Sequence, residues 1–439
     1  MTLSTEQAGT DLRAFVDASP SPFHAVAEMT RRLRDGGFTE LHEREHWSLA
    51  PGEAHYVVRD GGSVIAFRVG SAPAAEAGLR LVGTHTDSPT FKVRPRYDLT
   101  RGRYRLVGVE PYGGLLAHTW LDRELTVAGR LATRGADGGV ELHPVRLPGG
   151  PIRLPSLAIH LDRAVREGLK LDPQHQLVPV WGSDDADVAS LLDALADVAG
   201  VAADDVLGHD LVLADSQPSA ATGIDGSWVA APRLDNLGSC HSATLALLAA
   251  APAAHTQLVV ANDHEEVGSG SMEGARGSFL EDVVARIVAA TGDGETDGLR
   301  PYDPQDLHVA IARSHLVSAD MAHAQHPTQG ERHEASHAPA LGGGPVLKLN
   351  ANQSYATDAR SGGWFAARCA DAGVPLQHFV SRNDQPCGST IGPLTAMRLG
   401  LSTVDVGSPL LGMHSCRELG SAADVPLMVG ALIACLEIG

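Results

Sequence analysis

Two adjacent glutamates at the end of a short apolar run are the residues of this sequence that most clearly suggest chemistry. Glu265 and Glu266 follow the run Gln257–Ala261 in the order Asp263-His264-Glu265-Glu266. A carboxylate buried without a partner is strongly disfavoured, whereas a divalent cation can bind one carboxylate and leave its neighbour free as a base. A solvated turn would explain the pair equally well. The motif therefore suggests hydrolysis by metal-activated water if other residues supply further ligands.

Four other residues have the side-chain types of metal ligands. His85, Asp320 and His414 lie at or just beyond the ends of predicted strands, and Asp235 precedes a long apolar helix. Singly, each has an ordinary explanation as a loop residue or a helix cap. In open α/β sheets, however, ligands gather at strand ends, so we expect these residues to meet Glu266. Two histidines and three carboxylates suit a pair of Zn²⁺ or similar ions that share one bridging carboxylate.

The elements that would position these residues alternate between strands and helices. Apolar runs predict strands at Tyr56–Val58, Ser63–Phe67, Leu79–Gly83, Gln257–Ala261, His308–Ala312 and Thr403–Val406. Helical spacing predicts helices within Asp11–Leu33, broken at Ser19–Pro22, within Gly238–Ala251, and near Val425–Leu436. Strands that alternate with helices predict an α/β fold with a mainly parallel central sheet.

The sequence between about Pro89 and Asp225 has a different texture. Short strand-like runs at Tyr104–Val109, Leu125–Val127 and Leu142–Val145 are separated by glycine and proline. We therefore expect residues 89–225 to form an inserted β-rich domain, and residues 1–88 and 226–439 to form one discontinuous catalytic domain. The acidic, alanine-rich stretch Asp184–Ala203 predicts a surface helix or a flexible loop without chemistry.

Composition excludes several classes of function. The 439 residues are 43% hydrophobic and 20% charged, as in ordinary globular proteins, and the formal net charge of −19 disfavours nucleic acid and anionic membranes as partners. The five cysteines are scattered, the N-terminus lacks the features of a secretory signal, and no apolar stretch reaches the roughly 20 residues of a membrane helix. A cytoplasmic protein is expected. A redox or nucleotide-dependent enzyme is disfavoured because no G-x-G-x-x-G follows a strand.

The motifs together closely resemble those of the M18 metallopeptidases, the aspartyl aminopeptidase family, over nearly the whole chain. The stretches that carry the resemblance are Ser19–Val26, Gly83–Pro89, Arg233–Asn236, Asp263–Ser269, Ser318–His323 and Pro386–Gly392. The resemblance implies a zinc-peptidase-like catalytic domain in which Asp235 bridges two divalent cations. His85 and Asp320 would complete one metal site, and Glu266 and His414 the other.

The resemblance also implies a mechanism. Glu265 would be the unligated general base, which takes a proton from the metal-activated water during attack on the peptide carbonyl and delivers it to the leaving amine. Asp87 would orient His85 from behind, because a carboxylate near a histidine fixes which ring nitrogen faces a metal.

Substrate contacts are implied by the resemblance alone. It points to His323, Lys348 and Tyr355, and to His160 supplied by the inserted domain of a neighbouring subunit, although the sequence itself would assign these residues structural or solvated roles. Lys348 could neutralise a substrate carboxylate and so favour N-terminal Asp or Glu. The inserted domain would then drive dimerisation and cover the site, and dimers would assemble into a tetrahedral dodecamer.

Two alternatives stay open. The same metal ligands could serve a carboxypeptidase or an amide deacylase, which differ from an aminopeptidase in the need for a free substrate amine. The chain could also be a non-catalytic assembly or cargo-binding shell, although the intact Glu265 argues against this. The expected activity is hydrolysis of peptides with an unblocked N-terminus.

Overall fold

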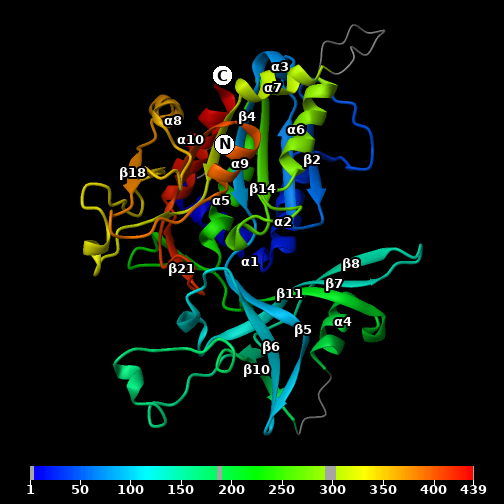
Figure 1. The fold of residues 1–439 in the computed structure, drawn as a ribbon, viewed down its shortest axis with the longest axis vertical. Helices are drawn as coiled ribbons and strands as arrows, with labels where there is room; N and C mark the ends of the chain where they lie inside the picture. Colours follow the sequence, from blue (N-terminus) through cyan, green and yellow to red (C-terminus); the bar gives the residue numbers. More distant parts are fainter. Residues whose placement is uncertain (1–3, 185–189, 292–302, 439) are drawn as a thin grey trace.

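The structure is a computed structural model that describes residues 4–184, 190–291 and 303–438. Its upper part in Figure 1 is built on a nine-stranded sheet. In spatial order its strands are β1 (Thr39–Glu40), β2 (Ala54–Arg59), β3 (Ser63–Arg68), β14 (Thr256–Asn262), β4 (Leu79–His85), β15 (His315–Ala319), β19 (Ser402–Gly407), β17 (Val346–Leu349) and β18 (Gln377–Val380). The neighbours β14, β4, β15 and β19 run parallel, so their carboxyl ends share one edge.

Helices cover both faces of this sheet, and alternate strand residues face each layer. Val82, Val259 and Val317 belong to the core beneath the helices α1 (Thr5–Ala18), α2 (Pro22–Asp35), α5 (Leu234–Ala249), α8 (Ala359–Asp371) and α10 (Asp424–Glu437). Leu81 and Leu316 belong to the opposite core, under α3 (Ala74–Ala77), α6 (Phe279–Ala290), α7 (Pro304–Ala312) and α9 (Ile391–Leu399). The expected mainly parallel α/β sheet is confirmed.

The predicted break at Ser19–Pro22 and the predicted closing helix are both present, and a capping box begins the first helix. Ser4 and Gln7 form a capping box at the start of α1, and the break at Ser19–Pro22 ends α1 and places Pro22 at the first position of α2, where proline is well tolerated. The predicted closing helix lies within α10. In the described part of the chain, none of the helices has both the length and the apolar character needed to cross a membrane.

The strand expected at His308–Ala312 is wrong. These residues form the last turns of α7, whose start is fixed by Asp303, which caps the backbone N–H of Gln305, and by Pro304 at the first helical position. Within His308–Ala312 only Ala310 and Ile311 are buried, because only one face of α7 packs against the core. The strand that enters the sheet is the next segment, β15.

A second sheet, of seven strands, forms the lower part of the molecule in Figure 1. Its order is β11 (Val206–Asp215), β5 (Thr90–Arg101), β6 (Tyr104–Tyr112), β10 (Val180–Ser183), β9 (Ile152–Arg153), β7 (Glu124–Arg134) and β8 (Val140–Arg146). Because β11 pairs with both β5 and β7, the sheet closes on itself. The strand runs predicted for this region are confirmed within β6, β7 and β8.

Short elements complete this region. They are α4 (Leu191–Ala199) and the 3₁₀ turns η1 (Ala117–Trp120), η2 (Ala164–Arg166) and η3 (Ala203–Asp205). The surface helix expected within Asp184–Ala203 is present as α4, while residues 185–189 lie outside the described residues.

A five-stranded sheet adjoins both larger ones. Its order is β12 (Ala220–Thr222), β13 (Trp228–Ala231), β21 (Glu418–Ser421), β20 (Pro409–Leu411) and β16 (Ala322–His323). Strand β12 pairs with β13 across the expected division at residues 225/226. The boundaries of the inserted domain stay a prediction.

Candidate metal centre

Side chains from distant parts of the chain meet at the carboxyl edge of the four parallel strands. His85 is the last residue of β4, Asp320 follows β15, and Glu266 lies in the 3₁₀ turn η4 (Glu265–Val267) just after β14. Asp235 lies in the first turn of α5 with non-helical backbone angles, and His414 lies in the loop between β20 and β21. The structure therefore brings together all five residues that the sequence proposed as ligands.

The two oxygens of Asp235 face two different histidines. Asp235 Oδ1 lies 3.5 Å from His85 Nε2, which is also 3.7 Å from Asp320 Oδ1. Asp235 Oδ2 lies 3.4 Å from His414 Nε2, which is 3.5 Å from Glu266 Oε2. Two clusters of nitrogen and oxygen atoms thus share Asp235, and in each cluster the atoms lie within 4.8 Å of one another.

This arrangement fits a pair of cations. A tetrahedral ion with bonds of about 2.1 Å separates its ligands by about 3.4 Å, close to the 3.4 to 3.7 Å between the nitrogen and oxygen atoms of these clusters. Asp235 Oδ1 and Glu266 Oε1 are buried and have no hydrogen-bond partner among the described residues, which is costly unless a cation binds them. Burial also raises the pKa of Glu266 well above its ordinary value, and Asp235 adds to this rise. The site therefore requires positive charge.

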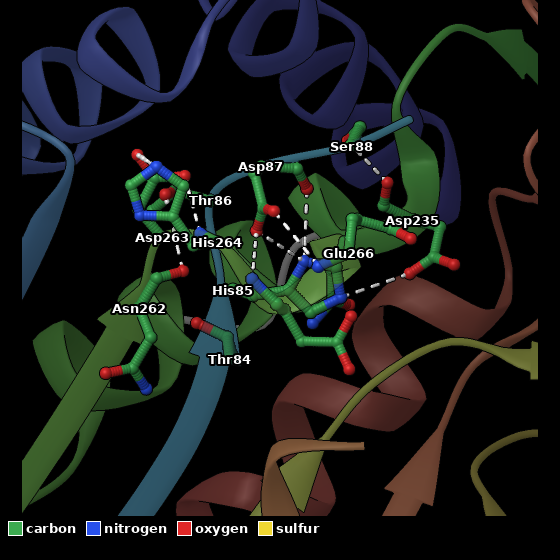
Figure 2. A network of polar contacts seen from close by, with 12 residues as sticks. Thr84, His85, Thr86, Asp87, Ser88, Asp235, Asn262, Asp263, His264 and Glu266 are labelled. Atoms are coloured by element: carbon green, nitrogen blue, oxygen red, sulfur yellow. Dashed lines mark hydrogen bonds and ion pairs between the residues drawn. The ribbon is translucent and has the colours of Figure 1, made fainter. Parts of the chain in front are cut away.

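Asp87 holds the backbone and His85 in place from behind. Its Oδ1 accepts a hydrogen bond from Glu265 N (3.1 Å), and its Oδ2 accepts from Glu266 N (3.1 Å) and from the Tyr112 hydroxyl (2.7 Å). His85 Nδ1 lies 3.0 Å from the Asp87 carbonyl oxygen and 3.3 Å from Oδ1, so it carries the proton and leaves Nε2 facing Asp235 (Figure 2). Burial alone would raise the pKa of Asp87, but His85 and the other donors outweigh it and lower this pKa.

His414 is oriented in a similar way by the lower part of the molecule. Its Nδ1 lies 3.2 Å from the carbonyl oxygen of Gly114, just beyond β6, and its backbone N–H donates to Glu418 Oε1 (2.8 Å). Glu418 Oε2 accepts from Asp235 N (3.0 Å). Burial, reinforced by Asp235, raises the pKa of Glu418 to about 8. Sequence reasoning missed both Glu418 and Tyr112, because neither lies in a motif.

Glu265 lies beside the two clusters that share Asp235 and belongs to neither of them. Its carboxylate is close to His85 and Glu266 and forms no hydrogen bond or ion pair with the described residues. Burial raises the pKa of Glu265 to about 8, since Asp320, Asp87 and Asp235 add to the rise and His85 only partly opposes it. A partly buried carboxyl group with such a pKa can both take and give a proton near neutral pH.

A pocket of about 390 Å³ opens onto these groups and is also lined by His323, Lys348 and Tyr355. Lys348 is only 2% exposed and donates to the carbonyl oxygens of Asp320 (2.8 Å) and Met321 (3.1 Å). Its Nζ lies 5.2 Å from the Tyr355 ring centre and 3.9 Å from Asp320 Oδ2. Lys348 therefore supports the backbone of a candidate ligand as well as the pocket wall.

His160 is the one proposed substrate-binding residue that does not line this pocket. It lies in the irregular segment between β9 and β10, where its side chain is exposed, and it is not among the described residues that line the pocket. Any contribution of His160 to a metal centre must therefore come from another copy of the chain or from a rearrangement.

Comparison with known proteins assigns the chain to a family. The model of the Aminopeptidase I zinc metalloprotease (M18) family matches residues 15–434. The chain belongs to the M18 family. This family is one of metal-dependent aminopeptidases, so the M18 chain has a zinc-peptidase fold and the residue types for such a site. The resemblance of the sequence motifs is confirmed.

Similar proteins cover nearly the whole M18 chain. The probable M18 family aminopeptidase 2 of Mycobacterium leprae is 46% identical over 97% of both chains, and that of Streptomyces coelicolor is 45% identical over 97% of both. Among solved structures, yeast aminopeptidase 1 superposes with a TM-score of 0.85 at 27% identity, covering 98% of this chain and 97% of the yeast chain. The S. cerevisiae mApe1 dodecamer gives a TM-score of 0.83 at 29% identity, with coverage of 98% and 96%.

Proposed function

We propose that this M18 peptidase is a di-metal aminopeptidase that removes N-terminal residues from peptides with a free amine and favours Asp or Glu at that position. The observation that carries the proposal is the placement of Asp235, whose two carboxylate oxygens face His85 on one side and His414 on the other. A single-metal site would need only one of these histidines. Two nitrogen and oxygen clusters with a shared carboxylate are the donor set of a two-metal hydrolase.

The proposed ligands divide between two cations. His85 and Asp320 would hold one cation, Glu266 and His414 would hold the other, and Asp235 would be shared between them. When bound, two divalent cations such as Zn²⁺ lower the pKa of a water molecule and polarise the substrate carbonyl.

Glu265 is the residue that moves the proton. It accepts one from the attacking water and delivers it to the leaving amine, which its unpaired carboxylate and raised pKa support. Asp87 fixes the backbone of both glutamates, because its Oδ1 accepts the N–H of Glu265 and its Oδ2 accepts the N–H of Glu266. One glutamate can then bind metal while the other stays free.

Substrate recognition is proposed for four residues. His323, Lys348 and Tyr355 line the pocket, and the ammonium group of Lys348 would attract an acidic N-terminal side chain. His160 would enter the site from a neighbouring subunit. The exposed Leu161 beside it, 76% accessible in the single chain, supports burial of this segment against another protein surface.

We also propose that the chain forms homo-oligomers, with residues 89–225 as the dimerisation and lid domain and dimers assembled into a tetrahedral dodecamer. The dodecamer of the similar S. cerevisiae mApe1 supports this. Five free cysteines, four of them buried, fit a reducing compartment, and we propose a cytoplasmic location.

The experiment that tests the function combines metal analysis with a peptide panel. The purified protein is expected to hold two equivalents of divalent metal per chain and to hydrolyse peptides with a free amine, fastest with N-terminal Asp or Glu. The matched N-acetylated peptides should resist hydrolysis. Cleavage of the acetylated set would instead indicate a deacylase or carboxypeptidase, and no turnover of either set would favour a non-catalytic shell.

A single substitution tests the general base. Glu265→Gln keeps the size of the side chain but cannot take up a proton. We expect metal content equal to that of the wild type and a turnover rate that is lower by about 100-fold or more, the usual contribution of a positioned acid–base group. An unchanged turnover rate would remove Glu265 from the mechanism.

A further inference from the structure

A second pocket adjoins the one at the metal centre. It has a volume of about 280 Å³, and its wall shares His323, Tyr355, Gly388 and Met413 with the metal pocket. The other walls come from the loop between β16 and β17, which includes the 3₁₀ turn η5 (Gly330–Arg332), and from the segment after β18. The two pockets are therefore neighbours, and a peptide anchored at the metals would have to pass these four residues to enter the second one.

The wall of this second pocket carries more cationic than anionic side chains, unlike the chain as a whole. The chain has a net charge of −19, yet the pocket wall carries the guanidinium groups of Arg332 and Arg382 and, among the described lining residues, the single carboxylate of Glu334. Arg382 is neutralised by a bidentate ion pair with Asp384, at 2.6 and 2.8 Å. Glu334 accepts a hydrogen bond from His337 Nδ1 at 2.5 Å.

Arg332 differs from these paired groups. Its side chain is exposed and forms no hydrogen bond or ion pair within residues 4–184, 190–291 and 303–438. The carboxylate of Asp384, whose pKa Arg332 helps to lower, is already bound by Arg382. A guanidinium offers five donors in a planar fork that matches a carboxylate. Arg332 is thus a cation in the pocket wall whose side-chain donors have no partner in the part of the chain that the structure describes.

Two imidazoles in the same wall add donors. His326 N donates to His333 Nε2 at 3.1 Å, and Thr328 N donates to His326 Nδ1 at 3.3 Å. A ring nitrogen that accepts a bond from a backbone N–H cannot carry a proton, so the proton of each neutral ring must be on its other nitrogen. His333 Nδ1 and His326 Nε2 are therefore N–H donors, and neither has an acceptor among the described residues.

We propose that this second pocket is a subsite that binds a carboxylate of the peptide downstream of the residue to be removed, with Arg332 as its cation and His326 and His333 as additional donors. The proposal rests on the aminopeptidase function proposed above. In that function the free amine lies at the buried metal centre, so the rest of the peptide must run outward to solvent, where Arg332 lies. Either an acidic side chain or the C-terminal carboxylate of a short peptide supplies the same chemistry.

The test uses the metal-loaded full-length enzyme and tetrapeptides that share one N-terminal residue. One series places Asp at the second, third or fourth position, and a parallel series keeps these positions neutral, each with a free or an amidated C-terminus. In the wild type, we expect a lower KM for peptides with a downstream carboxylate. Arg332→Ala should raise that KM about five-fold, as for an exposed charge pair, and leave the neutral amidated peptides unchanged.

Two further variants separate recognition from general charge effects. Arg332→Lys should restore most of the discrimination, because the cation returns. Arg360→Ala is the matched control, since Arg360 is an exposed arginine that lines neither pocket and its loss changes the net charge equally. The advantage of the carboxylate peptides should also weaken with added salt in the wild type but not in Arg332→Ala.

The outcomes distinguish the sources and the two proposals. An effect confined to free C-termini assigns the C-terminal carboxylate, and one that follows the position of Asp assigns a side chain. Equal KM changes for the neutral amidated peptides, or no KM change on Arg332→Ala for any downstream-carboxylate peptide, would overturn the subsite. If no peptide is cleaved, the aminopeptidase proposal fails, whereas calorimetric binding of the same peptides to Glu265→Gln, with and without Arg332→Ala, still decides the subsite.

Discussion

Asp87→Asn is the substitution that best tests how this metal centre is built. Each oxygen of Asp87 accepts a backbone N–H, Oδ1 from Glu265 and Oδ2 from Glu266, both at 3.1 Å. Asparagine has the same shape but only one oxygen. Whichever way its amide is turned, the NH₂ group faces a backbone N–H that cannot rotate away, so one donor opposes another.

The magnitude follows from these contacts. A hydrogen bond to a charged acceptor contributes about 1.5 to 3 kcal/mol, and a buried donor left without an acceptor costs about 1 to 3 kcal/mol. Because Asp87 is 1% exposed, water cannot compensate. We therefore expect Asp87→Asn to lower the free energy of unfolding by about 3 to 5 kcal/mol. We also expect a loss of metal affinity of about 10- to 100-fold, because the turn that carries both glutamates shifts.

The assays are urea unfolding of the metal-free protein, metal affinity by competition with a chelator, and kcat at saturating metal. Tyr112→Phe is the matched control, since it removes the hydroxyl donor to Asp87 (2.7 Å) but leaves both backbone contacts, and about 1 kcal/mol of destabilisation is expected. An Asp87→Asn protein with metal affinity within about three-fold of the wild type and stability within about 1 kcal/mol would refute the clamp.

Three other perturbations test the centre and the core. Chelation should abolish hydrolysis and lower the melting temperature, both restored by Zn²⁺, because the carboxylates then face one another without a cation. Asp235→Ala should reduce bound metal at both sites, measured by elemental analysis, whereas loss of only one equivalent would contradict a bridging role. Asp11 binds His241 and Arg32, both at 2.7 Å, so Asp11→Ala should cost about 2 to 4 kcal/mol in urea unfolding, with Asp11→Asn less harmful. Burial raises the pKa of Asp11, but the hydrogen bonds from His241 and Arg32 outweigh burial and lower this pKa below its ordinary value. The wild type should therefore lose this stabilisation as the pH falls below about 4. If the stability of Asp11→Ala showed the same pH profile as the wild type, this role of Asp11 would be rejected.

The candidate metal ligands could be proposed from the sequence because their positions follow a topological rule. Parallel neighbouring strands end at the same edge, so His85, Glu266 and Asp320 could be expected to meet once each was placed after a strand. Asp235 and His414 required the family resemblance to receive distinct roles. Neither the topological rule nor the family resemblance gives distances. Only the structure shows that one oxygen of Asp235 faces His85 and the other faces His414.

Other features could not be predicted from the sequence, for identifiable reasons. Glu418 and Tyr112 contact the centre through pairings between residues about 180 and 25 positions apart, and no local pattern encodes these. The strand expected at His308–Ala312 failed because so short an apolar run fits either period, and the deciding signal was the cap at Asp303. His160 lies in an irregular segment, whose position sequence periodicity cannot specify.

The two main sheets are coupled through the metal centre itself. The end of β6, in the seven-stranded sheet, supplies the Tyr112 hydroxyl to Asp87, and the nearby Gly114 carbonyl faces His414 Nδ1. Each candidate ligand histidine therefore has its second nitrogen directed by a group that depends on where this sheet lies. Because the orientation of the rings sets the direction of their metal-facing nitrogens, a displacement of the seven-stranded sheet would misalign both clusters at once. Packing at this junction thus sets the positions of the groups that orient both histidines.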